Sequence, residues 1–376
     1  MIPDDFGYGE DQQILRREAR RALESWCTLE TVRKIMETPE GHDEGMWRRM
    51  AEMGWLGLAV PEEHGGSDLS MVSLATLAEE MGRALLPSPF HGTLLATLLI
   101  REAGSASQRS AWLPRIVSGD LKGAVALAEA QSGWDLASVS ATATRKGDRI
   151  TLAGEKHLVT DAPSADLIVG TFREPEGLSL FAVEPGAAGV KVSPDRLVDQ
   201  TRRSGCVVFP GVEVGAEARM GAPGTALATL ARVMPRMWTA LAAEMAGGMD
   251  RILAITVDYA KVREQFGKQI GAFQAVKHPL VNVMIDVEMT RSLVYRAAAA
   301  IDHAPEKAER LSRMAKALAS DAYANAAAKA VQLHGGIGFT WECDVHLFFK
   351  RAQWSKFALG DAAHHRKHIA GMVIGD

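Results

Sequence analysis

Three long stretches in the C-terminal part of the chain carry an apolar pattern of helical period, and they constrain the fold more than any other feature. They run over residues 227–262, 275–302 and 305–333, and they show no short repeat period. Helices of this length bury their apolar faces mainly against one another. The sequence therefore predicts a bundle of long helices in this region.

The rest of the chain divides into a helical and an extended region. Helical periodicity runs from about residue 10 to 118, and after Gly119 short alternating runs separated by Gly and Pro continue to about 218. The clearest extended feature is a hairpin, in which residues 141–144 and 149–152 flank a turn at 146–148. We predict an α+β fold with an all-helical domain (1–118), a β domain (119–220) and a C-terminal helical bundle that mediates oligomerisation (221–376).

Charge and cysteine content exclude several classes of function. The formal net charge of −4 over 376 residues gives no reason to expect nucleic acid or an anionic membrane as a partner. Cys27, Cys206 and Cys343 lie far apart and outside any ligand-like spacing, which argues against a disulfide framework or a zinc site. No signal peptide or membrane-spanning run is visible, so we expect a cytoplasmic protein with a small or apolar ligand.

A glycine cluster ends the last long helical stretch, in the segment VQLHGGIGFTWE (331–342). Gly335 and Gly336 could serve as a helix C-cap, or they could let backbone N–H groups approach a phosphate. A second segment, REQFG (263–267), ends another long helix with a guanidinium and an aromatic ring, suited to a phosphate and a heterocycle. Two such segments in one helical region favour a cofactor site.

The two segments resemble the acyl-CoA dehydrogenase family. YAKVREQFGKQIGAFQAVKH (259–278) and VQLHGGIGFTWECDVHLFFKR (331–351) carry the specific motifs. Looser similarity covers MGWLGLAVPEEHGG (53–66), LAEAQSGWD (127–135) and EKHLVTDAPSAD (155–166). The resemblance implies the family's order of helical, β and helical domains, and FAD-dependent α,β-dehydrogenation of an acyl-CoA thioester with an electron-transfer acceptor.

The resemblance also implies where FAD binds. In the family, the arginine of the RxQFG segment and the QxxGG turn hold the pyrophosphate and adenosine of a flavin bound mainly by a neighbouring subunit. This role falls to six residues of this chain: Arg263, Gln265, Phe266, Gln332, Gly335 and Gly336. The chain is therefore expected to form an oligomer, because its cofactor site needs two subunits.

The family's catalytic base is missing from both of its usual positions. The position after the GG turn is Leu359, and the alternative position on the first long C-terminal helix is occupied by Met237 and Trp238. None of these side chains accepts a proton. Glu244 lies about two turns further along that helix, on the same face, and is the acid we would test as the base. A single Glu in an alanine-rich helix is also typical of a solvated or paired residue.

The flavin-ring segment departs from the family as well. Ala128 replaces a threonine that bonds the flavin, Trp134 replaces a small serine, and Leu158 takes the place of an aromatic ring. Thr160 keeps the hydroxyl that the family uses near the ring. The residues that the family uses to contact a partner's FAD are therefore kept in this chain. Several residues that would hold the chain's own flavin, and the residue that would act as the base, are replaced.

Several interpretations of this asymmetry stay open. The chain could be a complete homo-oligomeric dehydrogenase, the subunit of a heterotetramer with a related chain, or a flavin-free structural protein on this fold. An oxidase would differ only in its electron acceptor. The His364-His365-x-x-His368 cluster has metal-ligand spacing, but no acid completes it, so we assign no metal.

Overall fold

The computed structural model describes residues 2–186 and 189–375, and the chain separates into two compact units. The first comprises residues 1–34, 70–86 and 235–376, and the second comprises residues 35–69 and 87–234. N-terminal and C-terminal helices therefore share the first unit. The division into domains 1–118, 119–220 and 221–376 follows the type of element and stays a prediction.

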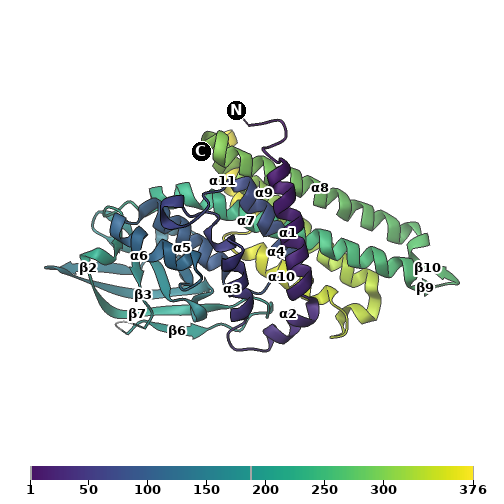
Figure 1. The fold of residues 1–376 in the computed structure, drawn as a ribbon, viewed down its shortest axis with the longest axis horizontal. Coiled ribbons are helices and arrows are strands. Elements are labelled where there is room, and N and C mark those ends of the chain that lie inside the picture. The colour runs from purple at the N-terminus through teal and green to yellow at the C-terminus, as the bar shows by residue number, and fades with distance from the viewer. Residues whose placement is uncertain (1, 187–188, 376) are drawn as a thin grey trace. The chain divides into compact units, whose positions relative to one another are not determined.

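The first unit consists mainly of helices, including the longest ones (Figure 1). Helices α7 (Ala226–Val262), α8 (Gln274–His303) and α9 (Pro305–His334) match the three predicted stretches to within one residue at each end. The prediction of long C-terminal helices is confirmed. The unit also contains α1 (Glu10–Trp26), most of α2 (Leu29–Met36), α4 (Met71–Arg83), α10 (Val345–Phe357) and α11 (Ala362–Ile374).

A short hairpin follows α7, in a region whose sequence predicts only helices. Strands β9 (Glu264–Gln265) and β10 (Lys268–Gln269) pair across a turn at Phe266 and Gly267. Both turn residues have positive φ, at 54° and 74°, as this type of tight turn requires. Strands of two residues are too short to produce a periodic pattern, so the sequence does not predict them.

Helices α4 and α7 cross with their backbones in contact. A Cβ atom at Gly82 would lie 1.9 Å from the carbonyl oxygen of Glu244, and one at Gly247 would lie 1.8 Å from that of Glu79. Any side chain at either position would separate the helices. The two glycines therefore bring buried glutamates of both helices into one region of the unit.

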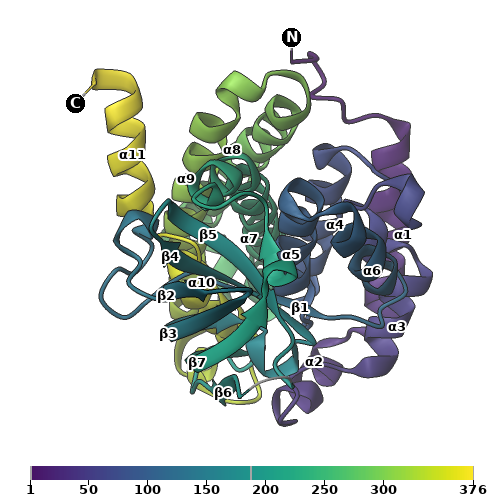
Figure 2. The same ribbon diagram turned by 90° about the vertical axis from the view of Figure 1, so that its left-hand side faces the viewer.

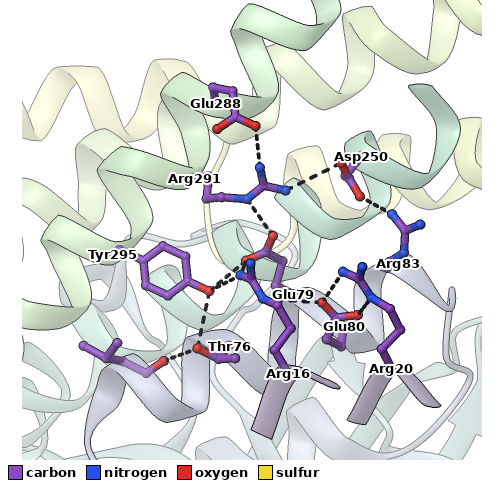
Figure 3. Close-up of polar contacts among 11 residues, drawn as sticks. Arg16, Arg20, Thr76, Glu79, Glu80, Arg83, Asp250, Glu288, Arg291 and Tyr295 are labelled. Carbon is purple, nitrogen blue, oxygen red and sulfur yellow. Dashed lines mark hydrogen bonds and ion pairs between the residues drawn. The ribbon is translucent and has the colours of Figure 1, made fainter. Parts of the chain in front are cut away.

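A network of buried charges ties α1 and α8 to α4, as Figure 3 shows. The Glu79 carboxylate accepts hydrogen bonds from Arg16 Nη2 at 2.7 Å and from Arg291 Nε at 2.8 Å. Glu80 accepts a bidentate pair from Arg20 at 2.8 and 2.7 Å. Because both carboxylates are buried, each arginine offsets a desolvation cost that would otherwise disfavour this packing.

The second unit combines helices with one large sheet. Its helices are α3 (Glu44–Glu52), α5 (Phe90–Ala103) and α6 (Ala106–Val117). Its strands are β1 (Gly123–Ala126), β2 (Thr142–Lys146), β3 (Arg149–Thr160), β4 (Leu167–Glu174), β5 (Gly177–Val183), β6 (Lys191–Pro194), β7 (Ser204–Gly215) and β8 (Arg219–Met220). The predicted hairpin is confirmed as β2 and β3, joined by Gly147 at φ 63°.

The strand order is β6-β7-β3-β2-β4-β5-β8, which Figure 2 shows as a fan, and β1 pairs with β4 in parallel. Helix α5 packs against β1. The buried ring of Phe172 packs edge to face against Phe181 and Phe209, with centroids 5.9 and 4.9 Å apart. No helix among the described residues is long and apolar enough to cross a bilayer.

Candidate functional site

The ends of α7 and α9 lie together in the first unit. Tyr259, in the last turn of α7, stacks on His334, the last residue of α9, with ring centroids 4.3 Å apart. The Tyr259 hydroxyl also donates to the His334 carbonyl at 3.4 Å. The structure thus places the two predicted cofactor segments, 263–267 and 332–336, at neighbouring helix ends.

The polar side chains of these segments face outward. Arg263 and Gln332 are exposed, and within the described parts of the chain neither side chain has a hydrogen-bond or ion-pair partner. Gln265 is also exposed, although its amide donates to the carbonyl of Glu264 at 2.8 Å. A guanidinium and an amide in this state are available to a molecule outside this chain.

Phe266 is the most unusual residue of the hairpin. Its side chain is 92% exposed, and its φ of 54° is rare for a bulky residue. Both features cost free energy, because an apolar ring in water gains no burial and the left-handed backbone is strained. Such a position points to a surface that another molecule covers.

The backbone conformation requires glycine at only one of the two positions of the turn. Gly335 caps α9 with φ 64°, so it is needed to end the helix. Gly336 has no such conformation, and a Cβ atom there would meet nothing within 4 Å. The packing of this chain therefore explains Gly335 alone, and it leaves the backbone at Gly336 open to a ligand.

In the second unit, a buried ion pair fixes the loop after β1. The Glu129 carboxylate accepts from Lys156 Nζ at 2.8 Å, from the Ser140 N–H and hydroxyl at 2.8 and 2.6 Å, and from the Ala141 N–H at 3.0 Å. Burial alone would raise the pKa of Glu129, but these donors lower it to about 2. The preceding Ala128 is buried, and its carbonyl accepts the His157 N–H at 2.9 Å.

A bulge distorts the end of β3, between Lys156 and Val159. It turns Leu158 outward at φ 51°, with 57% of its side chain exposed. Thr160 follows at the strand end, half-buried, and its hydroxyl has no partner in residues 2–186 or 189–375. Leu158 and Thr160 are therefore accessible, whereas Ala128 is buried and offers no side-chain hydrogen bond.

Aromatic and basic side chains lie near the two apolar positions of the expected base. Met237 and Trp238 are buried on α7, and the Arg313 guanidinium stacks over Trp238 at 4.1 Å. Leu359 lies in the turn between α10 and α11, at φ 56°. His365 of α11 contacts the Trp238 ring at 5.2 Å, so α7 and α11 meet beside this turn.

Lys316 of α9 holds the same turn in place. Its Nζ donates to the carbonyls of Gly360 at 2.8 Å and Lys356 at 3.3 Å, and to the Ser320 hydroxyl at 2.9 Å. Burial lowers the pKa of Lys316 to about 7. No sequence pattern identifies this lysine, because it lies 44 residues before the turn that it binds.

Glu244, the acid that the sequence offered as the base, and Asp361, which follows Leu359 by two residues, are engaged in other contacts. Glu244 forms an ion pair with Arg351 of α10, with Oε1 and Nη1 2.6 Å apart, and both side chains are buried. Asp361 caps α11 by accepting the His364 N–H at 2.8 Å. The role of Glu244 as a base stays a prediction, and the sequence contained no signal for Arg351 as its partner.

The histidine cluster at the C-terminus forms no set of three ligands. The rings of His364 and His368 lie 4.7 Å apart, and His365 is buried with a pKa that burial and nearby cations lower to about 2. In residues 2–186 and 189–375, a single group has three potential ligand atoms close together, and it contains none of these histidines.

Three family models match consecutive parts of the chain. Family models described as the acyl-CoA dehydrogenase N-terminal, middle and C-terminal domains match residues 9–120, 124–209 and 228–374. Acyl-CoA dehydrogenase IpdE2 of Mycobacterium tuberculosis is 31% identical over 348 residues, which are 92% of each chain.

Two solved structures show the same similarity. A variant of the Tcur3481-Tcur3483 steroid ACAD is 31% identical, with a TM-score of 0.89 over 97% of this chain and 98% of that chain. The ChsE4-ChsE5 complex from Mycobacterium tuberculosis is 27% identical, with a TM-score of 0.89 over 99% of both chains.

Proposed function

Because the chain belongs to the acyl-CoA dehydrogenase family of flavoprotein oxidoreductases, we propose that it serves FAD-dependent α,β-dehydrogenation of an acyl-CoA thioester as one subunit of a heteromeric enzyme. One contrast carries the proposal. The side chains suited to FAD, such as Arg263 and Gln332, are exposed and unpartnered in the described chain, whereas the candidate base Glu244 is buried in an ion pair.

The described residues fit FAD at the ends of α7 and α9. Arg263 offers a bidentate donor for a pyrophosphate oxygen, Phe266 offers an exposed ring for stacking, and the backbone at Gly336 is open to close approach. In the second unit, the Thr160 hydroxyl is available to a flavin ring. When bound, FAD would accept the hydride that leaves the β-carbon of the acyl group.

The missing element is a carboxylate that takes the proton next to the thioester carbonyl. Such a base must lie close to that proton and be free to accept it. Leu359 and Met237 accept no proton, and the basic side chains of Arg313 and Lys316 lie near these positions. We assign the base to a related partner chain, which would also pass electrons to the acceptor through the shared flavin.

The names of the two solved relatives support this assignment. Both the Tcur3481-Tcur3483 protein and the ChsE4-ChsE5 complex are named as pairs of different chains. The first is named a steroid ACAD, so a steroid-derived acyl-CoA is one substrate to test beside a straight-chain acyl-CoA.

Co-expression tests the proposal. The chain is produced alone and together with a family member that has a glutamate at the position of Leu359 or Met237, and flavin content and anaerobic bleaching by acyl-CoA are measured. We expect bleaching of the complex and at least about 100-fold slower bleaching of the chain alone, as is typical when a positioned base is absent. Equally fast bleaching of a homo-oligomer would contradict the proposal, and colourless protein in both preparations would support a flavin-free role.

A pair of variants separates a catalytic from a structural role of Glu244. Glu244→Gln and Arg351→Gln both break the same buried ion pair, so both should destabilise the fold to a similar degree. Under our proposal, the folded complexes that contain either variant bleach their flavin at the same rate. If Glu244→Gln alone abolishes bleaching, Glu244 is the base and the chain supplies it.

A further inference from the structure

Three side chains with metal-binding atoms meet on the exposed side of strands β3 and β7. The Glu155 carboxylate lies 3.1 Å from His157 Nε2 and 3.0 Å from Cys206 Sγ, and the three ligand atoms all lie within 4.8 Å of one another. Within the described residues this is the one group of its kind. It contains none of the residues assigned to FAD.

The sheet register brings the three residues together. Glu155 and His157 are two residues apart, so they share one face of β3, while Lys156 between them points into the interior. On β7, Gly205 pairs with Val159 and Val207 pairs with Lys156, which places Cys206 opposite the bulge. The bulge therefore lets one residue of β7 face two side chains of β3.

The spacing of the ligand atoms suits a tetrahedral ion. For Zn²⁺ with bond lengths of about 2.0–2.3 Å, neighbouring ligand atoms lie roughly 3.4–3.6 Å apart. The two measured separations are shorter than this by less than about 0.6 Å, a gap that small side-chain rotations close. Thiolate, imidazole and carboxylate together are a ligand set that Zn²⁺ accepts.

We propose that Glu155, His157 and Cys206 form a site for a divalent transition metal ion of the zinc type. The side chains of Glu155 and His157 are 52% and 36% exposed, so the ion can enter from solvent and a water molecule can take the fourth position. A bound metal ion would also cross-link β7 to the distorted end of β3.

The charges of the group support a cation at this place. The Cys206 thiol donates its proton to the Glu155 carboxylate, with the sulfur and the carboxylate oxygen 3.0 Å apart. A bound metal ion replaces that proton, which passes to solvent as the Sγ–metal bond forms. The ion then compensates the charges of both the thiolate and the carboxylate.

Cobalt provides a test that does not depend on enzyme activity. Co²⁺ added to the purified full-length protein should produce a thiolate-to-cobalt charge-transfer band, and Zn²⁺ should remove the band by competition. Cys206→Ser should abolish the band. His157→Gln should weaken binding by about 100-fold or more, because even the loss of an outer partner costs about 10–100-fold.

Cys343→Ser is the matched control, since Cys343 is a second partly accessible thiol outside the group and should leave the band unchanged. The absence of a band in the folded protein would overturn the proposal. So would a band that survives Cys206→Ser and disappears in Cys343→Ser. Because flavin content is measured separately, failure of this site and failure of the FAD proposal give different results.

Discussion

At the residue scale, two arginines allow a direct test of the FAD segment. Arg263 follows the last turn of α7 and Arg251 lies within the same helix, and neither guanidinium has a partner in the described parts of the chain. Arg263→Ala should weaken FAD binding in the assembled enzyme by roughly 10–100-fold, because a hydrogen bond to a charged group contributes about 1.5–3 kcal/mol. Flavin titration of the apoenzyme measures this change.

Arg251→Ala removes the same charge from within α7, at a position that lines a cavity beside α1. We expect it to leave the affinity for FAD unchanged. Equal weakening by both substitutions would show that the effect of Arg263→Ala comes from net charge or from helix stability, and it would remove the assigned contact.

At the scale of elements, the Glu129–Lys156 pair joins the loop after β1 to β3. The pKa of Glu129 is about 2 in the folded protein, below the ordinary value of 4.5. Because the pKa of Glu129 is lower in the folded protein, the ionised carboxylate stabilises the fold in full at pH values above 4.5. This contribution is lost as the pH falls from 4.5 towards 2. Burial lowers the pKa of Lys156, which shows that desolvation offsets part of the attraction.

We therefore expect Glu129→Gln to lower the free energy of unfolding at pH 7 by about 2–3 kcal/mol, with a smaller difference from the wild type at pH 3. Urea unfolding at both pH values measures it. The control is Glu213→Gln, which breaks the exposed pair with Arg149 on β3 and should change stability by less than about 0.5 kcal/mol. A pH-independent difference for Glu129→Gln would contradict the assigned ionisation.

At the scale of the whole molecule, helix α8 carries an apolar stripe that is exposed in the single chain. Val281, Met284, Ile285 and Met289 lie on one face of the helix, each about half exposed (47–54%). Exposed apolar side chains that adjoin one another are typical of protein interfaces. We predict that the related partner chain of the heteromeric enzyme covers this face.

Met289→Glu places a charge in the stripe and should shift the purified protein from oligomer to smaller species, as measured by light scattering after gel filtration. Met53→Glu is the control, because Met53 is similarly exposed, at 42%, directly after the short helix α3 of the other unit. If both variants keep the size of the wild type, α8 does not form the interface.

Local patterns in the sequence determined most of the secondary structure. The bounds of α7, α8 and α9 follow from apolar periodicity over about 30 residues, and the β2–β3 hairpin follows from alternation around a glycine turn. The motifs at 263–267 and 332–336 were also readable, since each is a contiguous segment at a helix end. These features depend on residues that are neighbours along the chain.

Only the tertiary structure decided which distant residues meet. Arg351 lies 107 residues from Glu244, and Cys206 lies 51 residues from Glu155, so no spacing rule links either pair. The cysteines looked unsuited to a metal in the sequence, yet a bulge in β3 brings one of them to a histidine and a glutamate. Periodicity predicts which face of a helix or strand is buried. The partner of a buried charge or a thiol depends instead on sheet register and on where helices cross.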